Sequence, residues 1–264
     1  MIDWLLVTAG AFTGLLVGMT GAGGGTLMTP LLLLVFGVAP FAAVGTDLWF
    51  AATTKVFASR IHHGHGLIDW QVVKRLWLGS LTASALTLVW IRFNPIDESA
   101  VGWMKTVIGV AVLFTAIGML FQKTLHTLGR KLRTSDGEQF KAWQGPLTIV
   151  AGVALGVLVT LTSVGAGALG TVFLAYLYPL RLSTPRLIAT EVVHAIPLAL
   201  FAGMGHLVMG NVDFMLLGNL LIGSIPAVMI GAMLSVRLSH SFLRVALAIV
   251  LMSISIKLLT SALG

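Results

Sequence analysis

The sequence lacks cysteine and is poor in charge. The absence of cysteine excludes disulfides, thiolate chemistry and cysteine-ligated metals. Only 9% of the 264 residues are charged and 57% are hydrophobic, whereas about 25% of residues are charged in soluble domains. A soluble protein could not cover its surface with so few charges, which excludes a cytosolic enzyme, a disordered chain and a nucleic-acid binder. The mean hydropathy of +1.00 and the long apolar runs predict an all-α polytopic membrane protein, because β-barrel strands would read as short alternating segments.

Ten apolar stretches divide the chain, and we expect 8–10 membrane segments, because a spanning helix needs about 20 apolar residues. The stretches are residues 3–20, 26–39, 42–60, 71–93, 101–121, 145–162, 168–180, 186–206, 214–236 and 242–263. The second and seventh are short, and each follows a break of small residues, GAGGG at 21–25 and SVGAG at 163–167. Such breaks can interrupt a helix inside the membrane, where the freed backbone must be buried in protein or line a cavity.

The chain contains an internal repeat. At an offset of 142, nine of the nineteen residues from 14 to 32 match residues 156–174. At an offset of 144, Thr46-Asp47 aligns with Thr190-Glu191, and such polar matches are more informative than apolar identities between membrane helices. We therefore expect two transmembrane repeats, residues 1–121 and 145–264, joined by a basic cytoplasmic linker at 122–144.

The basic residues indicate how the repeats are oriented, because cytoplasmic loops are enriched in lysine and arginine. In the first repeat Arg60, Lys74 and Arg75 flank one loop, and the matching loop at 204–219 has no lysine or arginine. The second repeat carries its basic residues in other loops, at Arg181, Arg186, Arg237 and Arg244. The charge bias changes sides between the halves, which predicts inverted repeats with both termini outside. Each repeat would have five spans, or three spans and a helical hairpin.

The two small-residue breaks are candidate anion sites. Glycine lets backbone N–H groups approach a ligand closely, and the N-terminus of a helix carries a partial positive charge. In inverted-repeat transporters, broken helices direct these ends at anionic groups near the midplane; close helix packing through small residues is the alternative. The candidate substrate-binding residues are Gly23, Gly24, Gly25, Thr26, Thr46, Gly165, Ala166, Gly167 and Thr190.

Four ionisable residues within apolar segments are candidates for coupling or gating. Because a charge at the middle of a membrane costs about 2.5–3.5 kcal/mol, Asp47 and Glu191 are expected to face a cavity or a partner and to suit cation or proton coupling. Their alternative role is that of acidic charges near a helix start. Lys55, whose repeat equivalent is Ala199, could be a counter-ion for an anion or extend to the interface. His194 follows Glu191 by three residues on one helix face and could relay protons.

Motifs for other chemistry are missing or weak. The sequence has no GxxxxGKS or GxxxxGKT, no HExxH and no GxSxG pattern, so we expect no enzyme activity and no cofactor. His62, His63 and His65 cluster without cysteine or carboxylate partners, so we expect no metal site there.

Several motifs of the first half recur, in degenerate form, in the second. They are GMTGAGGGTLMTPLLLL, AVGTDL, GLIDW and GSL, followed by SVGAGALGT, ATEV, GNVDF and GSI. With these motifs the chain resembles the TauE/SafE family of membrane transporters over almost its whole length. The second copy has Ser163 in place of Gly21, Ala166 in place of Gly24 and Glu191 in place of Asp47. The resemblance implies an inner-membrane carrier of small sulfur oxyanions or sulfonates.

Together these inferences predict a secondary transporter, in the exporting direction, for sulfite or an organosulfonate bound near the midplane between the two repeats. A passive anion channel and an intramembrane enzyme are the alternatives. The expected partners are the small anion, the lipid bilayer, a coupling proton or cation and a second copy of the chain, but no nucleic acid. The expected location is the inner (plasma) membrane, crossed several times.

Overall fold

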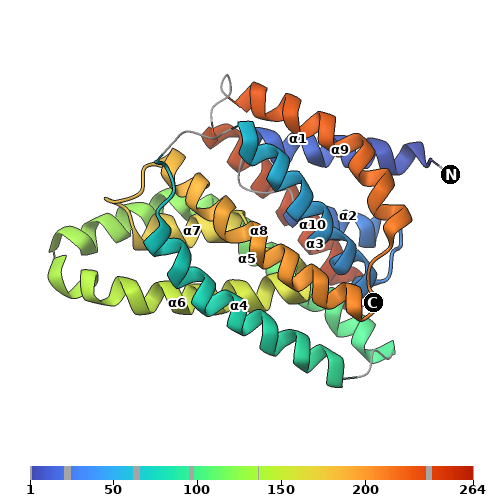
Figure 1. The fold of residues 1–264 in the computed structure, drawn as a ribbon, viewed down its shortest axis with the longest axis horizontal. Helices are drawn as coiled ribbons and strands as arrows, with labels where there is room; N and C mark the ends of the chain where they lie inside the picture. Colours follow the sequence, from blue (N-terminus) through green and yellow to red (C-terminus); the bar gives the residue numbers. More distant parts are fainter. Residues whose placement is uncertain are drawn as a thin grey trace.

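The computed structural model describes residues 2–20, 25–61, 66–94, 98–135, 137–235 and 240–263. These residues form ten helices and no strand, which confirms the predicted all-α fold (Figure 1). The helices are α1 (Trp4–Thr20), α2 (Gly25–Leu34), α3 (Pro40–Ile61), α4 (Trp70–Phe93), α5 (Glu98–Ser135), α6 (Gly137–Thr162), α7 (Ala168–Leu177), α8 (Thr184–Val208), α9 (Phe214–Ser235) and α10 (His240–Leu263).

Six of the described helices are long and apolar enough to cross a membrane, which agrees with a multi-pass membrane protein. They are α4, α5, α6, α8, α9 and α10. Helix α3 has 22 residues but is not among the six. Its polar side chains, Asp47 and Lys55 among them, lower its hydropathy, and these side chains are enclosed by the other helices rather than by lipid.

The two short helices, α2 and α7, have ten residues each, so each is about 15 Å long, half the thickness of a bilayer core of about 30 Å. Helix α7 folds back along α6. The side-chain amide of Gln144 donates to the Leu177 carbonyl over 2.6 Å, and the hydroxyls of Thr148 and Tyr178 lie 2.7 Å apart. The end of α7 therefore lies beside the first turns of α6, and the two helices form a hairpin. The second half therefore contains the helical hairpin of the two arrangements that we considered.

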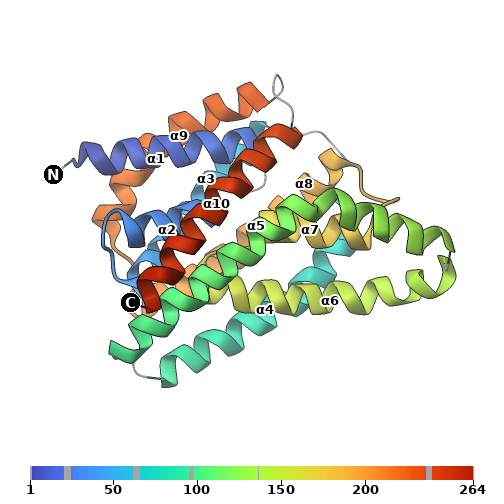
Figure 2. The same ribbon diagram turned by 180° about the vertical axis from the view of Figure 1, so that it is seen from behind.

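Contacts between the halves occur in matching pairs. Helix α1 packs on α9 and α4 packs on α6, as Figures 1 and 2 both show. In the first pair Gly10 lies against the backbone of Leu220, and in the second Gly152 lies against the backbone of Leu76. A Cβ atom would come within 2.1 Å of the Leu220 carbonyl oxygen and within 2.5 Å of the Leu76 carbonyl oxygen. The offsets of the sequence repeat, 142 and 144, relate one contact to the other.

Residues 122–144, which we expected to link the halves, are helical where the structure describes them. They extend α5 and begin α6, and the resulting helical hairpin projects beyond the other helices in Figures 1 and 2. The end of α7 packs into this hairpin, since the Tyr176 ring contacts Phe140 edge-on at a centroid distance of 6.1 Å and the Tyr176 backbone lies against Gly129. The connection is thus part of the packed structure.

Basic residues of both halves meet at one end of the helix bundle. The Arg181 guanidinium binds both carboxylate oxygens of Asp69, at 2.6 and 2.8 Å, and Arg75 donates to the Tyr178 hydroxyl over 3.5 Å. The loop between α3 and α4 therefore lies beside the turn between α7 and α8. The chain ends lie together away from the α5–α6 hairpin in both views (Figures 1 and 2).

The main apolar core includes residues of both short helices, α2 and α7. Leu27 and Met28 of α2 belong to the same buried cluster as Val164 and Ala166 of the second break. The beginnings of α2 and α7 are therefore part of one interior, and residues 163–170 are all buried.

Candidate functional site

Four ionisable side chains are buried where α3 contacts α8. Asp47 and Lys55 lie on α3, Glu191 and His194 lie on α8, and none is more than 2% exposed. Charges removed from water in this way are costly unless each finds a partner. The partners of each group therefore show what the site can do.

Asp47 is held at the beginning of α2. Its Oδ2 atom accepts hydrogen bonds from the Thr29 backbone N–H over 3.1 Å and from the Thr29 hydroxyl over 2.5 Å. The other oxygen, Oδ1, is buried and has no hydrogen-bond partner among the described residues. Ser163 of the second break lies next to this carboxylate, and its hydroxyl also lacks a partner. Asp47 thus connects α2 with the second break through one satisfied and one free oxygen.

Glu191 is paired with a lysine of the other half. The Lys55 ammonium lies 3.6 Å from Glu191 Oε2 and donates to the Ala166 carbonyl over 3.0 Å. The Glu191 side chain also lies against α7, where a Cβ atom on Gly170 would come within 2.8 Å of Glu191 Cγ. Neither carboxylate oxygen makes a hydrogen bond within the described part of the chain. The distance between the ammonium and the carboxylate is long for an ion pair. The shorter of the two Lys55 contacts is the one with the Ala166 carbonyl of the second break.

The second break adopts a conformation that favours glycine. Gly165 and Gly167 have φ angles of 109° and 122°, which residues with a Cβ rarely adopt. Ser163 precedes them with a φ of 58°, a left-handed conformation that costs a residue other than glycine about 1 kcal/mol or more. The turn ends α6 and starts α7 within six residues. It presents the Ala166 carbonyl to Lys55 and the first turn of α7 to Glu191.

His194 connects the cluster to α4. Its Nε2 lies 2.9 Å from the Ser80 hydroxyl, and its backbone carbonyl accepts from the Trp77 indole N–H over 3.1 Å. The remaining ring nitrogen, Nδ1, is buried without a hydrogen-bond partner in the described structure. His194 is therefore fixed by α4 on one side and has a free ring position on the other.

Thr46 and Thr190 have structural partners. The Thr190 hydroxyl accepts from the backbone N–H of Asp69 over 3.1 Å, and the Thr46 hydroxyl accepts from the backbone N–H of Asp213 over 3.0 Å. Asp69 and Asp213 in turn accept from backbone N–H groups in the first turns of α4 and α9. Each threonine thus anchors the start of a helix of the other half, and the substrate contact that we expected for both stays a prediction.

The remaining candidate residues divide into two groups. Ala166 contacts Lys55, Gly167 lies next to Glu191, and Gly165 lies against the side chains of Leu169 and Leu155. Gly25 and Thr26 begin α2. Gly23 and Gly24 lie outside the described residues, as do His62, His63 and His65.

The sequence argument missed Thr29 as the partner of Asp47, Ser80 as the partner of His194, and Ser163 as a neighbour of Asp47. A signal for Thr29 was present, because Thr29 and Thr171 are matched positions of the repeat. Ser80 carried a signal of the same kind, because Ser80 and Ser224 match at the offset of 144. Ser163 carried none, since it aligns with Gly21 and small hydroxyl residues are common in the interior of membrane helices.

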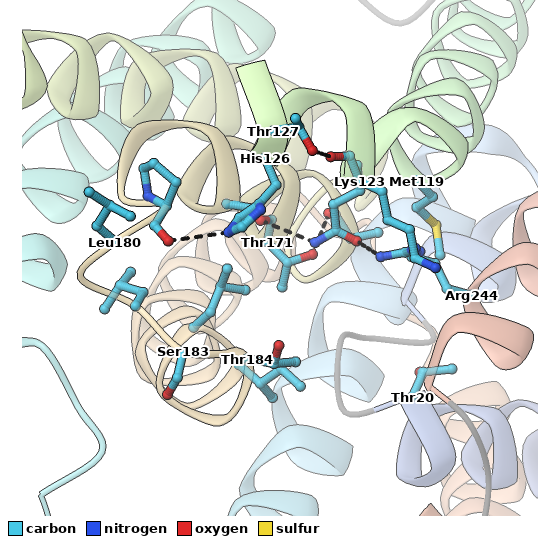
Figure 3. Close-up of a pocket in the computed structure, with 17 residues that line it drawn as sticks. Thr20, Met119, Lys123, His126, Thr127, Thr171, Leu180, Ser183, Thr184 and Arg244 are labelled. Atoms are coloured by element: carbon cyan, nitrogen blue, oxygen red, sulfur yellow. Dashed lines mark hydrogen bonds between the residues drawn. The ribbon is translucent and has the colours of Figure 1, made fainter. Parts of the chain in front are cut away.

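A cavity of about 760 Å³ opens beside α7. Figure 3 shows its lining, which comes from the end of α1, α5, α7, the turn after α7, the start of α8 and α10. His126 donates to the Pro179 carbonyl over 3.2 Å, and Arg244 donates to the side-chain oxygen of Gln122 over 2.7 Å. Ala168 and Thr171 of α7 face this cavity, whereas Gly170 between them contacts Glu191. The short helix α7 thus separates the cavity from the buried charges.

Comparison with known proteins identifies the family. Residues 6–258 match the family model described as "Sulfite exporter TauE/SafE". The chain is 35% identical over 263 residues to the probable membrane transporter protein YjnA of Bacillus subtilis, with 96% of this chain and 98% of that protein covered. It is 26% identical over 222 residues to the probable membrane transporter protein YdhB of the same organism, with 81% and 82% covered. It is also 27% identical over 217 residues to the probable membrane transporter protein MJ0441 of Methanocaldococcus jannaschii, with 79% and 73% covered.

No solved structure matches the chain significantly. The family and these relatives are membrane transporters and not enzymes, which agrees with the absence of hydrolase and nucleotide-binding motifs in the sequence. The family resemblance inferred from the sequence motifs is therefore confirmed, and the chain belongs to the TauE/SafE family of multi-pass membrane transporters.

Proposed function

We propose that the protein is a secondary transporter that exports sulfite or a small organosulfonate across the plasma membrane, and that the anion binds at the second break. The observation that carries this proposal is the position of Lys55. A lysine of the first half reaches the Ala166 carbonyl of the second break and lies beside Glu191. The Lys55 side chain is only 2% exposed. A buried cation in the membrane interior belongs to a substrate or ion pathway more often than to a structural contact.

The positive charges of this site could bind an oxoanion in place of the Glu191 carboxylate. Lys55 offers one positive charge, and the first turn of α7 adds the partial positive charge of a helix N-terminus. Glu191 now occupies the position of the counter-ion, at 3.6 Å from the ammonium. An anion that enters brings a second negative charge close to Glu191. We therefore expect Glu191 to take up a proton when the anion binds, which would couple transport to a proton.

Asp47 and His194 are the other groups that we propose for proton coupling. Asp47 has a free oxygen beside Ser163, and His194 has a free ring nitrogen. Both lie on the helices that carry Lys55 and Glu191, so a proton gained or lost at either would change the charge at the same centre.

We further propose that the two halves form inverted repeats around this centre, each with three spans and one hairpin. The paired contacts of α1 with α9 and of α4 with α6 support this proposal. The reciprocal hydrogen bonds, from Asp69 to Thr190 and from Asp213 to Thr46, support it at the level of single residues. With the basic end of the bundle in the cytoplasm, the hairpin of α6 and α7 opens to the cytoplasm, and the described ends of the chain lie outside.

The test is anion flux in proteoliposomes, with sulfite and sulfoacetate as substrates and an imposed pH gradient. We expect Lys55→Met and Glu191→Gln to lower the initial rate of the preferred substrate at least tenfold. Lys257→Met is the matched control, because Lys257 is an exposed lysine of α10, and it should transport at the wild-type rate. Wild-type flux of both anions by Lys55→Met would contradict the proposed site. Flux that does not saturate with substrate and ignores the pH gradient would indicate a channel.

A further inference from the structure

The cavity beside α7 has a composition that the central charges do not explain. Its volume of about 760 Å³ lies within the range of about 300–1,000 Å³ that is typical of small-molecule sites. A sulfite ion alone would fill a small part of it. The two walls of the cavity differ in chemistry, and this difference indicates which kind of anion would fill the space.

One wall is cationic. It is formed by Lys123 and His126 of α5 and by Arg244 of α10, and no aspartate or glutamate occurs among the described residues that line the cavity. Arg244 uses one terminal nitrogen to hold Gln122, but its Nε is buried and has no hydrogen-bond partner in the described part of the chain. A donor left free beside a lysine is a contact that an oxoanion can complete.

The opposite wall is mainly apolar. Leu180, Leu182, Leu187 and Ile188 line it from the turn after α7 and from the start of α8. An anion consisting only of oxygen atoms around a centre gains nothing from these side chains. An anion with a short carbon chain would bind about fourfold more tightly for each methylene group that it buries against these side chains.

The cavity also reaches residues that flank the two breaks. Thr20, the last residue of α1, lines it (Figure 3), and so does Ala168, the first residue of α7. Thr171 lies on the same face of α7 one turn later, and Gly170 on the other face touches Glu191. Only helix α7 therefore separates a ligand in the cavity from the Lys55–Glu191 pair.

We propose that this cavity is a vestibule that binds an organic oxoanion with a short apolar chain. The anionic head binds Lys123 and Arg244, and the chain lies against Leu180 and its apolar neighbours. The role of the vestibule as an entry site rests on the proposed transport function, whereas binding in it does not. The vestibule favours an alkylsulfonate over sulfite, which selects one substrate class of the two proposed above.

The experiment is isothermal titration calorimetry of the full-length protein in phosphatidylcholine nanodiscs, with propanesulfonate and sulfite as probes. We expect propanesulfonate to bind more tightly than sulfite. Lys123→Gln and Arg244→Gln should each weaken propanesulfonate binding about tenfold, the value of one charged hydrogen bond. Lys123 is exposed, so its replacement does not threaten folding. Lys131→Gln is the matched control, because Lys131 is an exposed lysine of α5 that does not line the cavity.

The apolar wall has its own test. Leu180, which is 59% exposed, can be changed to serine without loss of core packing. Leu180→Ser should weaken propanesulfonate binding and leave sulfite binding unchanged. Equal loss for both anions, or wild-type affinity of Lys123→Gln and Arg244→Gln for propanesulfonate, would overturn the proposal.

A lipid headgroup offers the same anionic chemistry, and nanodiscs that contain phosphatidylglycerol separate the two sources. If phosphatidylglycerol removes propanesulfonate binding and remains bound to the wild type but not to Lys123→Gln, the cavity is a lipid site and the vestibule proposal fails. Failure of the proposed transport site would give a different result. Lys55→Met would then transport as the wild type does, while propanesulfonate would still bind in calorimetry.

Discussion

Asp47 of the first half and Glu191 of the second follow a threonine at matched positions of the repeat, but their surroundings differ. Asp47 is held by neutral donors, the backbone N–H and hydroxyl of Thr29. Glu191 faces Lys55, and the residue that corresponds to Thr29 is Thr171, whose hydroxyl bonds within its own helix. The residue that corresponds to Lys55 is Ala199. The two acidic residues have thus acquired partners of different charge.

Backbone contacts between the two halves, in contrast, occur in matching pairs. Gly10 and Gly152 lie against carbonyl groups of the opposite half, and Thr46 and Thr190 each anchor a helix start there. The comparison shows that packing contacts of the two halves match, whereas the partners of their buried acidic residues differ. We infer that the scaffold has to be symmetric for the halves to fit, whereas the chemistry at the centre needs only one lysine.

The largest effect on stability should come from the Lys55–Glu191 pair, which has no counterpart around Asp47. Lys55→Met leaves the Glu191 carboxylate buried without a cation, which should lower the free energy of unfolding by about 3–5 kcal/mol. The double variant Lys55→Met/Glu191→Gln should recover most of this loss, because no charge is then left unpaired. Asp47→Asn should cost less than Glu191→Gln, because the amide oxygen can still accept from Thr29.

Unfolding in mixed detergent micelles, followed by circular dichroism, measures these differences. If the double variant is as unstable as the two single variants combined, the Lys55–Glu191 contact does not contribute as a pair. Equal losses in Asp47→Asn and Glu191→Gln would remove the difference between the two halves.

The next largest effect concerns the glycine contacts that occur twice. Gly10→Ala and Gly152→Ala each place a Cβ atom within 2.5 Å of a carbonyl oxygen, so the helices must separate. Overpacking of this kind costs about 1–3 kcal/mol, and we expect the two losses to agree within about 0.5 kcal/mol, the scatter of independent sites.

Gly218→Ala is the control, because Gly218 lies in α9 and a Cβ atom there has nothing within 4 Å. It should leave stability unchanged or raise it, since alanine favours helix. A loss in Gly218→Ala equal to that in Gly10→Ala would show that the cost does not arise from helix packing. The same unfolding assay measures all three variants.

Much of this fold could be predicted from the sequence because membrane helices depend on local hydropathy. All ten apolar stretches correspond to helices, and the predicted break at 163–167 separates α6 from α7. Helix α1 ends at Thr20 and α2 begins at Gly25, on either side of the other predicted break. The helical character of residues 122–144 was harder to predict. Their lysines, arginines and glutamines favour helix, but the packing of Tyr176 against Phe140 is a tertiary contact.

The sequence pointed to the buried ionisable residues but not to their partners. A cavity or a partner was expected for Asp47 and Glu191 from the cost of charge in an apolar segment, whereas for Lys55 extension to the membrane interface was an open alternative. The partners of these residues come from helices that are distant in sequence, as with Lys55 and Ala166, which are 111 residues apart. Which helices meet depends on packing between the halves, and no local pattern carries that information. For the same reason, the partners of Thr46 and Thr190 across the halves could not be read from the sequence.

The smallest effect, and the most direct measure of the symmetry, should come from these two threonines. Thr46→Val and Thr190→Val each remove one hydroxyl that accepts from the backbone N–H of an aspartate in the other half. Each should lower the free energy of unfolding by about 1 kcal/mol, the net value of a typical hydrogen bond, and the two losses should be equal. Both threonines hold helix starts rather than the anion in our proposal, so both variants should keep the wild-type KM for sulfoacetate in proteoliposomes. Should Thr190→Val raise this KM several-fold while Thr46→Val does not, Thr190 would belong to the binding site, and the asymmetry of the charges would extend to the scaffold around them.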